Sequence, residues 1–234
     1  MPTPVVFSWR AGKDSALGLW TLLQDPAFEV LAILTTLTEG YQRVSMSGVR
    51  EELLDCQAER LGLPLVKVWI PPTCPNSVYE ERMAQALAAE PLRSVRHFAF
   101  ADLFLADVRV YREERLAKAG REGVFPLWGR DTAELARELI ATGFRATLVC
   151  VDPKALPTSF AGRAFDEQLL ADLPATVDPC GERGEFHTFV WDAPMYRAPI
   201  GCRMGEVVTR DGFVFCDVLS LAASDDIAGL TPNP

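Results

Sequence analysis

Short apolar segments alternate with amphipathic ones through the first half of the chain, and this alternation restricts the fold more than any other feature. Four segments rich in β-branched and aromatic residues predict strands: Val5–Phe7, Val30–Thr36, Leu65–Ile70 and His97–Phe100. Four others carry apolar residues at helical spacing: Ala16–Leu23, Val49–Leu61, Val78–Ala89 and Leu105–Ala119. We therefore expect a parallel sheet flanked by helices, which binds its ligand at the edge where the loops follow the strands.

The pattern changes after about residue 120. Two further helices are expected at Thr132–Thr142 and Phe165–Leu173. The expected strands are Thr147–Val151, Glu185–Trp191, Cys202–Arg210 and Phe213–Leu221, with a hairpin turn at Arg210-Asp211-Gly212. The predicted fold class is therefore α/β, with a first domain at 1–124 and a smaller C-terminal α+β domain at 125–221. Residues 222–234 are predicted to form a flexible tail.

Composition excludes several classes of protein. Hydrophobic residues make up 49% of the 234 residues, enough for a sizeable core. The net charge of −9 argues against a broad nucleic-acid surface, which needs clustered Lys and Arg. The six cysteines form no C-x-x-C pair, so they predict no zinc site and fit the reduced thiols of a cytoplasmic protein. No signal peptide is recognisable, and no apolar run approaches the roughly 18 residues of a membrane helix.

The segment Ser8–Ser15 joins the first predicted strand to the first predicted helix. Main-chain N–H groups at such a junction, together with the helix dipole, favour an anion such as phosphate. Gly12 would let the backbone approach the anion, while Lys13 adds a positive charge and Ser15 a hydroxyl. A carboxylate beside phosphates is repulsive unless it binds Mg²⁺ or caps the helix, so Asp14 is expected to do one of these.

The loop does not match the Walker A pattern, but it resembles the S-G-G-x-D-S loop of the PP-loop ATP pyrophosphatase superfamily. Two positions depart from that pattern, with Arg10 in place of Ser and Ala11 in place of Gly. Ala11 is expected to fit provided that its φ is negative. The alternative is a strand, turn and helix in which Asp14 merely caps the helix.

A second motif lies at Asp178–Val190, which contains one of the two histidines of the chain. On a strand, Glu185 and His187 would share a face, as a general base or an amine-binding pair requires. The alternative is a structural histidine held by hydrogen bonds beside a turn. This segment and the following Asp192-Ala193-Pro194 resemble the C-G-E-x-G-E-[FY]-H-T-F-V signature of the diphthine–ammonia ligase family, also called the ATP-binding domain 4 family.

The resemblance extends over most of the chain, including Ser45–Arg50, Gln57–Pro64, Asp102–Arg109 and Pro126–Gly129. It implies a HUP-like fold, similar to the adenine nucleotide α-hydrolases. Ser47 stands where the family often has His, and Ala101 where it often has Gly. We therefore expect a divergent member of the family. Its source stays open, and a member from bacteria would have no diphthine, so that its acceptor would be another molecule.

The family resemblance implies an ATP-dependent ligase that uses Mg²⁺. It would adenylate a carboxylate on a small molecule or protein, and ammonia would then displace AMP from the adenylate. Implied ATP-binding residues are Ser8, Trp9, Arg10, Ala11, Gly12, Lys13, Asp14, Ser15, Thr35, Thr36, Met46 and Asp102. Implied substrate-binding residues are Glu182, Gly184, Glu185, His187 and Thr188. Catalysis is assigned to Asp14, Glu185 and His187, and the metal to Asp14.

Two other functions stay open. One is an adenine-nucleotide sensor that binds without turnover, for which the altered loop would be suited. The other is a PP-loop enzyme that modifies tRNA, although the acidic composition and the scattered cysteines argue against it. The sequence shows no glutaminase-like segment, so free ammonia is the expected nitrogen source, and a homodimer is an open expectation.

Overall fold

The computed structural model describes residues 1–221, so the predicted tail at 222–234 lies outside the described residues. Its first sheet is built on β1 (Thr3–Ser8), which pairs in parallel with β2 (Phe28–Thr38) and β5 (His97–Ala99). The sheet continues from β5 to parallel β6 (Glu122–Val124), and from β2 to parallel β4 (Leu65–Ile70). The short β3 (Arg43–Val44) runs antiparallel to the end of β2.

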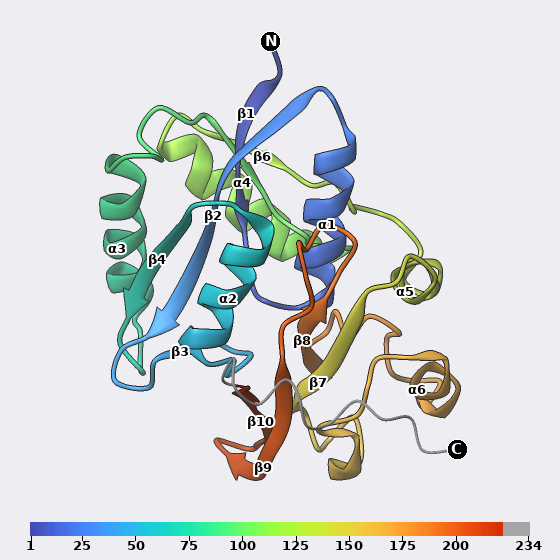
Figure 1. Cartoon of the computed structure of the whole chain (residues 1–234). Helices are drawn as coiled ribbons and strands as arrows, with labels where there is room; N and C mark the ends of the chain where they lie inside the picture. The colour runs from blue at the N-terminus through green and yellow to red at the C-terminus, as the bar shows by residue number, and fades with distance from the viewer. Residues whose placement is uncertain (222–234) are drawn as a thin grey trace.

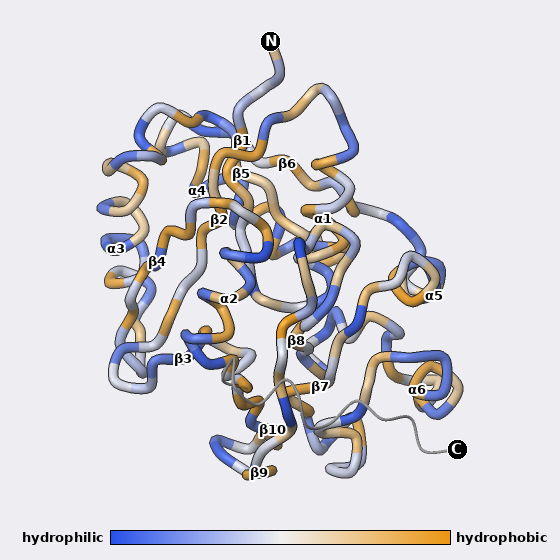
Figure 2. The backbone as a smooth tube through the Cα atoms, in the orientation of Figure 1, coloured by the Kyte–Doolittle hydropathy of each residue, from blue (hydrophilic) through white to orange (hydrophobic). Residues whose placement is uncertain are grey.

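Helices cover both faces of this sheet (Figure 1). Residues of α1 (Lys13–Gln24) and α2 (Glu51–Leu61) join the core on one face, into which Val5 and Phe7 of β1 also project. Residues of α3 (Asn76–Ala88) and α4 (Ala106–Lys118) join a smaller cluster on the other face, around Val6. Figure 2 shows hydrophobic residues along the central strands, where both faces of the sheet are covered.

A second, antiparallel sheet follows, with the strand order β8-β7-β10-β9. It consists of β7 (Arg145–Val151), β8 (Phe186–Asp192), β9 (Cys202–Arg210) and β10 (Phe213–Ser220). The last two strands meet at Asp211 and Gly212, whose φ of 51° and 83° fit the type I′ turn of a two-residue hairpin. The sheet is accompanied by α5 (Thr132–Ala141), the short α6 (Glu167–Asp172) and a 3₁₀ turn, η1 (Thr158–Phe160).

The predicted fold class is confirmed, including the parallel first sheet and the α+β character of the second region. Strands β3 and β6 were not predicted, because neither has the aromatic residues that marked β5 in the sequence. Along the chain, the strands of the first sheet end at residue 124 and those of the second sheet come after it. The larger hydrophobic core nevertheless contains residues of both sheets. The domain boundary itself stays a prediction. All six cysteines are free thiols, and none of the described helices has the length and hydropathy of a membrane span.

Candidate functional site

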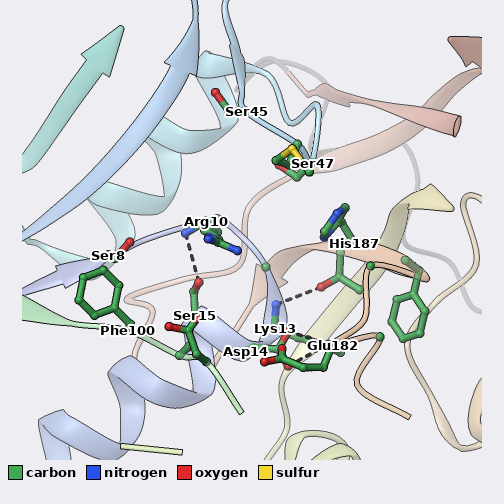
Figure 3. Close-up of a pocket in the computed structure, with 18 of the residues that line it drawn as sticks. Ser8, Arg10, Lys13, Asp14, Ser15, Ser45, Ser47, Phe100, Glu182 and His187 are labelled. Atoms are coloured by element: carbon green, nitrogen blue, oxygen red, sulfur yellow. Dashed lines mark hydrogen bonds and ion pairs between the residues drawn. The ribbon is translucent and has the colours of Figure 1, made fainter. Parts of the chain in front are cut away.

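The loop after β1 and the first turn of α1 lie at the carboxyl end of the central strand, beside β8 and the turn that precedes it (Figure 3). A cavity opens between them. Most of the residues predicted to bind ligands line it: Ser8, Arg10, Gly12, Lys13, Asp14, Ser15, Met46, Asp102, Glu182, Gly184, His187 and Thr188. The two sequence motifs, about 170 positions apart in the chain, therefore form one site.

The loop is fixed to β8 by its main chain. The Val190 N–H donates to the Ala11 carbonyl at 3.0 Å, and the Lys13 N–H donates to Thr188 Oγ1 at 3.0 Å. A Cβ at Gly12 would lie 3.0 Å from the Thr188 carbonyl oxygen, so a larger residue there would push the strand away. Gly12 is thus required for a close approach to β8, a reason that the sequence did not reveal.

Gln57 of α2 holds the same junction from a fully buried position. Its Nε2 donates to the carbonyls of Ala11 and Val190, at 3.0 and 2.7 Å, and its Oε1 accepts from Trp9 Nε1 at 2.8 Å. A single amide therefore connects α2, the loop and β8. Because Trp9 and Ala11 are buried in this network, their side chains do not line the cavity.

The expectation that Ala11 has a negative φ is wrong, because its φ is +63°. This left-handed conformation costs a residue with a Cβ roughly 1–2 kcal/mol, which explains why the superfamily pattern has Gly at the position. The loop keeps its turn despite the substitution. It does so because Gln57 and Val190 both bond the Ala11 carbonyl, and because the Ser15 hydroxyl accepts the Arg10 N–H at 3.2 Å.

Lys13 is the buried cation of the site, with 2% of its surface exposed. Its amine lies 2.8 Å from the Asp14 carboxylate, donates to the Cys180 carbonyl, and is 5.2 Å from the centre of the Phe186 ring. Burial alone would lower the pKa of Lys13, but the neighbouring Asp14 carboxylate raises it. The amine therefore keeps its charge next to the helix N-terminus.

A second basic group enters the cavity from α4. The Arg112 guanidinium bonds both oxygens of Asp102, at 2.5 and 3.1 Å, and lies 4.4 Å from the Phe100 ring centre. Arg10, whose side chain is exposed to solvent, lines the same space. Together with Lys13, these residues place three cationic groups around one cavity. No sequence motif pointed to Arg112.

The turn before β8 is ordered by two carboxylates. Asp178 Oδ1 accepts the Cys180 N–H at 2.9 Å, while Thr132 donates to Asp178 Oδ2 at 2.7 Å. Glu185, 7% exposed, accepts the N–H groups of Asp178 and Arg183, at 3.1 and 2.9 Å. Glu185 thus lies beneath the turn and does not line the cavity. Both of its oxygens accept hydrogen bonds from main-chain donors, and its catalytic role stays a prediction.

Two titratable groups of the turn and of β8 have strongly shifted pKa values. Burial, with added repulsion from Asp14 and Asp102, raises the pKa of Glu182 to about 7, although its Oε1 accepts the Leu103 N–H at 2.8 Å. Burial, followed by the positive charges of Arg10 and Lys13, lowers the pKa of His187 to about 4. At neutral pH the imidazole is therefore uncharged, and Glu182 is divided between its two forms.

The remaining predicted residues occupy structural positions in β2. Thr35 is buried and donates its hydroxyl to the Trp9 carbonyl at 2.9 Å, and the Thr36 carbonyl accepts the Ser45 N–H at 3.0 Å. Neither lines the cavity. Residues on its wall that the sequence did not indicate as ligand-binding are Ser45, Ser47, Phe100, Ala101, Arg112, Gly181 and Phe186. Within residues 1–221, no group of three or more potential metal ligands is arranged to hold an ion by itself.

Comparison with known proteins shows which family the chain resembles. Residues 3–93 match a family model described as the diphthamide synthase N-terminal domain, and residues 131–218 match its C-terminal domain. Proteins named diphthine–ammonia ligase are 29% identical in Homo sapiens and 31% in Bos taurus, each over 140 residues. These matches cover 55% of this chain and only 52% of each relative, about half their length.

The protein of the same name from Danio rerio is 28% identical over 188 residues, which are 73% of this chain and 72% of the relative. The two family models together include the Ser8–Ser15 loop, α2 and all of β8. The Gly12–Ser15 and Glu182–Thr188 segments of the cavity thus fall within matched regions, whereas Phe100–Asp102 and Arg112 lie between them. The chain belongs to the diphthine–ammonia ligase family.

Proposed function

We propose that this protein is an ATP-dependent amidoligase, which adenylates a carboxylate and transfers ammonia to it. A carboxylate oxygen attacks the α-phosphorus of ATP, and pyrophosphate leaves. Ammonia then attacks the acyl carbon, loses a proton, and AMP departs with the bonding electrons. The observation that supports this best is the meeting of the Gly12–Ser15 helix start with the Glu182–Thr188 segment in one cavity.

One half of the cavity, lined by Lys13, Arg10 and Arg112, is basic and suits the polyphosphate of ATP. The first turn of α1 has N–H groups without partners inside the helix, and these add to the charges of Lys13, Arg10 and Arg112. A phosphate that reached Lys13 would compete with Asp14 for the amine, and one that reached Arg112 would compete with Asp102. Mg²⁺ fits here only with phosphate oxygens among its ligands, because it commonly binds one or two carboxylates plus substrate phosphates. Asp14 would be such a carboxylate, and the ion would screen the phosphate charge.

The other half of the cavity, which contains Glu182 and His187, suits the step in which ammonia attacks the acyl-adenylate. A base works best when its pKa is near the working pH, so Glu182, with a pKa of about 7, is better matched than His187, with a pKa of about 4. We assign Glu182 to take the proton that ammonia loses. His187, being neutral, would orient the acceptor by hydrogen bonding, and Glu185 would order the turn.

The test is the formation of AMP from ATP and Mg²⁺ with ammonium and a panel of carboxylic acids. AMP should appear only when an acceptor carboxylate is present, and ¹⁸O from a labelled carboxylate should be found in the AMP. Lys13→Met should lower kcat about 100-fold or more, as the loss of a preorganised charge on a transition state does. Lys67→Met is the control, because Lys67 pairs with Glu51 and Asp55 away from the cavity.

A nucleotide sensor is the second candidate, and one observation favours it. Lys13 is already engaged by Asp14 and by the Cys180 carbonyl, so its charge is partly used without a ligand. A sensor would bind MgATP and release no AMP with any acid of the panel. Thiolation of tRNA is less well supported, because burial raises the pKa of Cys180, the cysteine of the turn, and so disfavours the reactive thiolate.

A further inference from the structure

A groove lies between α3 and α4, the two helices on the face of the first sheet opposite to α1 and α2 (Figure 1). Helix α3 contacts β4 and α4 contacts β6, and these two strands have β2, β1 and β5 between them. Strands are spaced about 4.8 Å apart, so β4 and β6 are about 19 Å apart, whereas helices that pack together have axes about 8–10 Å apart. The spacing of the strands therefore leaves room between the helices, about 570 Å³ in volume.

The walls of this groove are mainly apolar. Both helices and the residue after β5 contribute large apolar or aromatic side chains to it: Tyr79, Met83, Leu87, Phe100, Tyr111 and Leu116. Ala84, Ala88 and Ala119 line it as well, and their small side chains keep it open. No residue of α3 is buried, as expected for a helix with one side on the sheet and another on an open groove.

The groove is continuous with the candidate site. Phe100 and Arg112 line both the cavity and the groove, and the guanidinium of Arg112 lies 4.4 Å from the centre of the Phe100 ring. Arg112 bonds Asp102 through Nε and Nη2, while its Nη1 has no hydrogen bond to another residue of 1–221. A cationic donor is thus available where the groove meets the cavity.

Away from the cavity, the groove has few groups for a polar ligand. Helix α3 starts after the carboxyl end of β4, so Tyr79 lies at the cavity end of the groove and Leu87 about 12 Å farther along. Arg121 closes the far end, where its guanidinium donates to three main-chain carbonyls, including that of Leu87 at 2.6 Å. On the wall, Arg115 pairs with Glu80 at 2.8 Å, and only its buried Nε has no partner among the described residues.

The cavity alone is too small for two substrates. It encloses about 110 Å³, whereas sites for small molecules typically have roughly 300–1,000 Å³. A nucleotide and an acceptor that react in the cavity must therefore extend beyond it in different directions. The groove beyond Arg112 is one such extension, and its apolar walls select the kind of molecule that fits.

We infer that the groove binds the body of the acceptor, and that this acceptor is a carboxylic acid with an extended apolar chain. The inference rests on the proposed function, because it takes the carboxylate of this acid as the group that is adenylated. The carboxylate lies beside Arg112 in the cavity, near phosphates held at Lys13, and the chain runs between α3 and α4 toward Leu87. Burial of each methylene should tighten binding about three- to fourfold.

NMR of ¹³C-labelled methionine methyl groups tests the binding step without turnover. Of the five methionines, Met83 lies in the groove, and Met204 on β9 is the internal control. Octanoate should shift the Met83 signal and leave the Met204 signal in place. The affinity should rise about three- to fourfold per methylene from butanoate to octanoate. Met83→Leu, which conserves volume, identifies the signal.

A variant that fills the groove tests the turnover step. Ala84→Phe puts a ring into the groove from an exposed position of α3. It should raise KM for octanoate in AMP formation at least about tenfold, as expected when two or more methylenes stay in water, with little change in KM for butanoate. Ala117→Phe is the matched control, because Ala117 is exposed on α4 and does not line the groove. Circular dichroism establishes that each variant is folded.

These measurements distinguish a failure of the inference from a failure of the proposed function. If octanoate leaves the Met83 signal in place, or shifts Met83 and Met204 alike, the groove does not bind the chain, while AMP formation with any acid still supports the ligase. If Ala84→Phe raises KM for butanoate and octanoate equally, the role of the groove in turnover is wrong. If octanoate shifts Met83 and no acid gives AMP, the groove binds such acids and the proposed function is wrong.

Discussion

Buried charges in this site have partners of opposite charge close by. Lys13 is buried with a carboxylate 2.8 Å from its amine, and Asp102 is buried with both oxygens on Arg112. Such pairs cost desolvation energy, and removal of one partner would leave an uncompensated buried charge. The buried charges of Lys13 and Asp102 are therefore neutralised by protein groups without a ligand. A phosphate that enters must replace these internal bonds, which favours a ligand with several negative charges over one with a single charge.

Replacement of Ala11 tests the backbone strain of the loop. Replacement of Ala11 by Gly relieves roughly 1–2 kcal/mol of left-handed strain. It also loses about 0.8 kcal/mol of methyl burial and about 0.4–1 kcal/mol through the freer unfolded chain. The free energy of unfolding, measured in urea, should therefore change by less than about 1 kcal/mol. Ala136→Gly, at an equally buried helical position, should cost about 2 kcal/mol. Equal losses in both variants would show that Ala11 is not strained.

Glu182 gives a prediction in the pH dependence of stability. Its folded pKa of about 7 exceeds the ordinary value of 4.5, so the folded state holds a proton that the unfolded chain has released. The contribution of Glu182 to stability therefore falls as pH rises from 4.5 to 7. Glu182→Gln should gain stability relative to the unchanged protein between pH 5 and pH 8 in urea unfolding. Exposed Glu81→Gln controls for loss of a carboxylate, and parallel pH profiles would contradict the assignment.

At the scale of elements, apolar periodicity was sufficient for the long helices and strands. Gly62 ends α2 in the left-handed conformation, and its N–H bonds the Ala58 carbonyl, as a glycine after a helical pattern predicts. Motifs also indicated the Ser8–Ser15 loop and the turn before β8, which line one cavity, as parts of a candidate site. Sequence could not reveal Gln57 as the link between them, or Arg112 as a wall of the cavity. The partners of both residues come from distant segments, and they are set by tertiary packing rather than by local pattern.

The junction at Gln57 should be energetically important. Gln57→Ala leaves the Trp9 indole N–H without its acceptor and removes a donor from the carbonyls of Ala11 and Val190. A loss of about 2–4 kcal/mol is expected in the free energy of unfolding, with a higher KM for ATP because the loop loosens. Gln85→Ala removes an exposed amide of α3 that bonds only Glu81, and should cost less than about 0.5 kcal/mol. Similar small losses in both would show that the loop does not depend on this amide.

At the scale of the whole molecule, the two sheets share one core. The larger hydrophobic cluster contains Val5 and Phe7 of the first sheet together with Leu148, Phe189 and Val190 of the second. Hydrogen bonds between β8 and the Ser8–Ser15 loop connect the two sheets. So do the ion pairs of Asp217 in β10 with Arg43 and Arg50. The site thus forms only when both regions are folded.

This coupling predicts one cooperative unfolding transition for the described regions. Phe189→Ala in β8 removes a fully buried ring and should cost about 3–5 kcal/mol. Unfolding in urea is followed by tryptophan fluorescence in two variants, one that keeps only Trp9 in the first region and one that keeps only Trp191 in the second. Because the core is shared, Phe189→Ala should lower the urea midpoint of both probes equally. Val207→Ala, half exposed on β9, is the control that should shift neither midpoint. If Phe189→Ala lowers the Trp191 midpoint and leaves that of Trp9 in place, the sheets are independent units. The cavity would then be an interface between two separately stable domains.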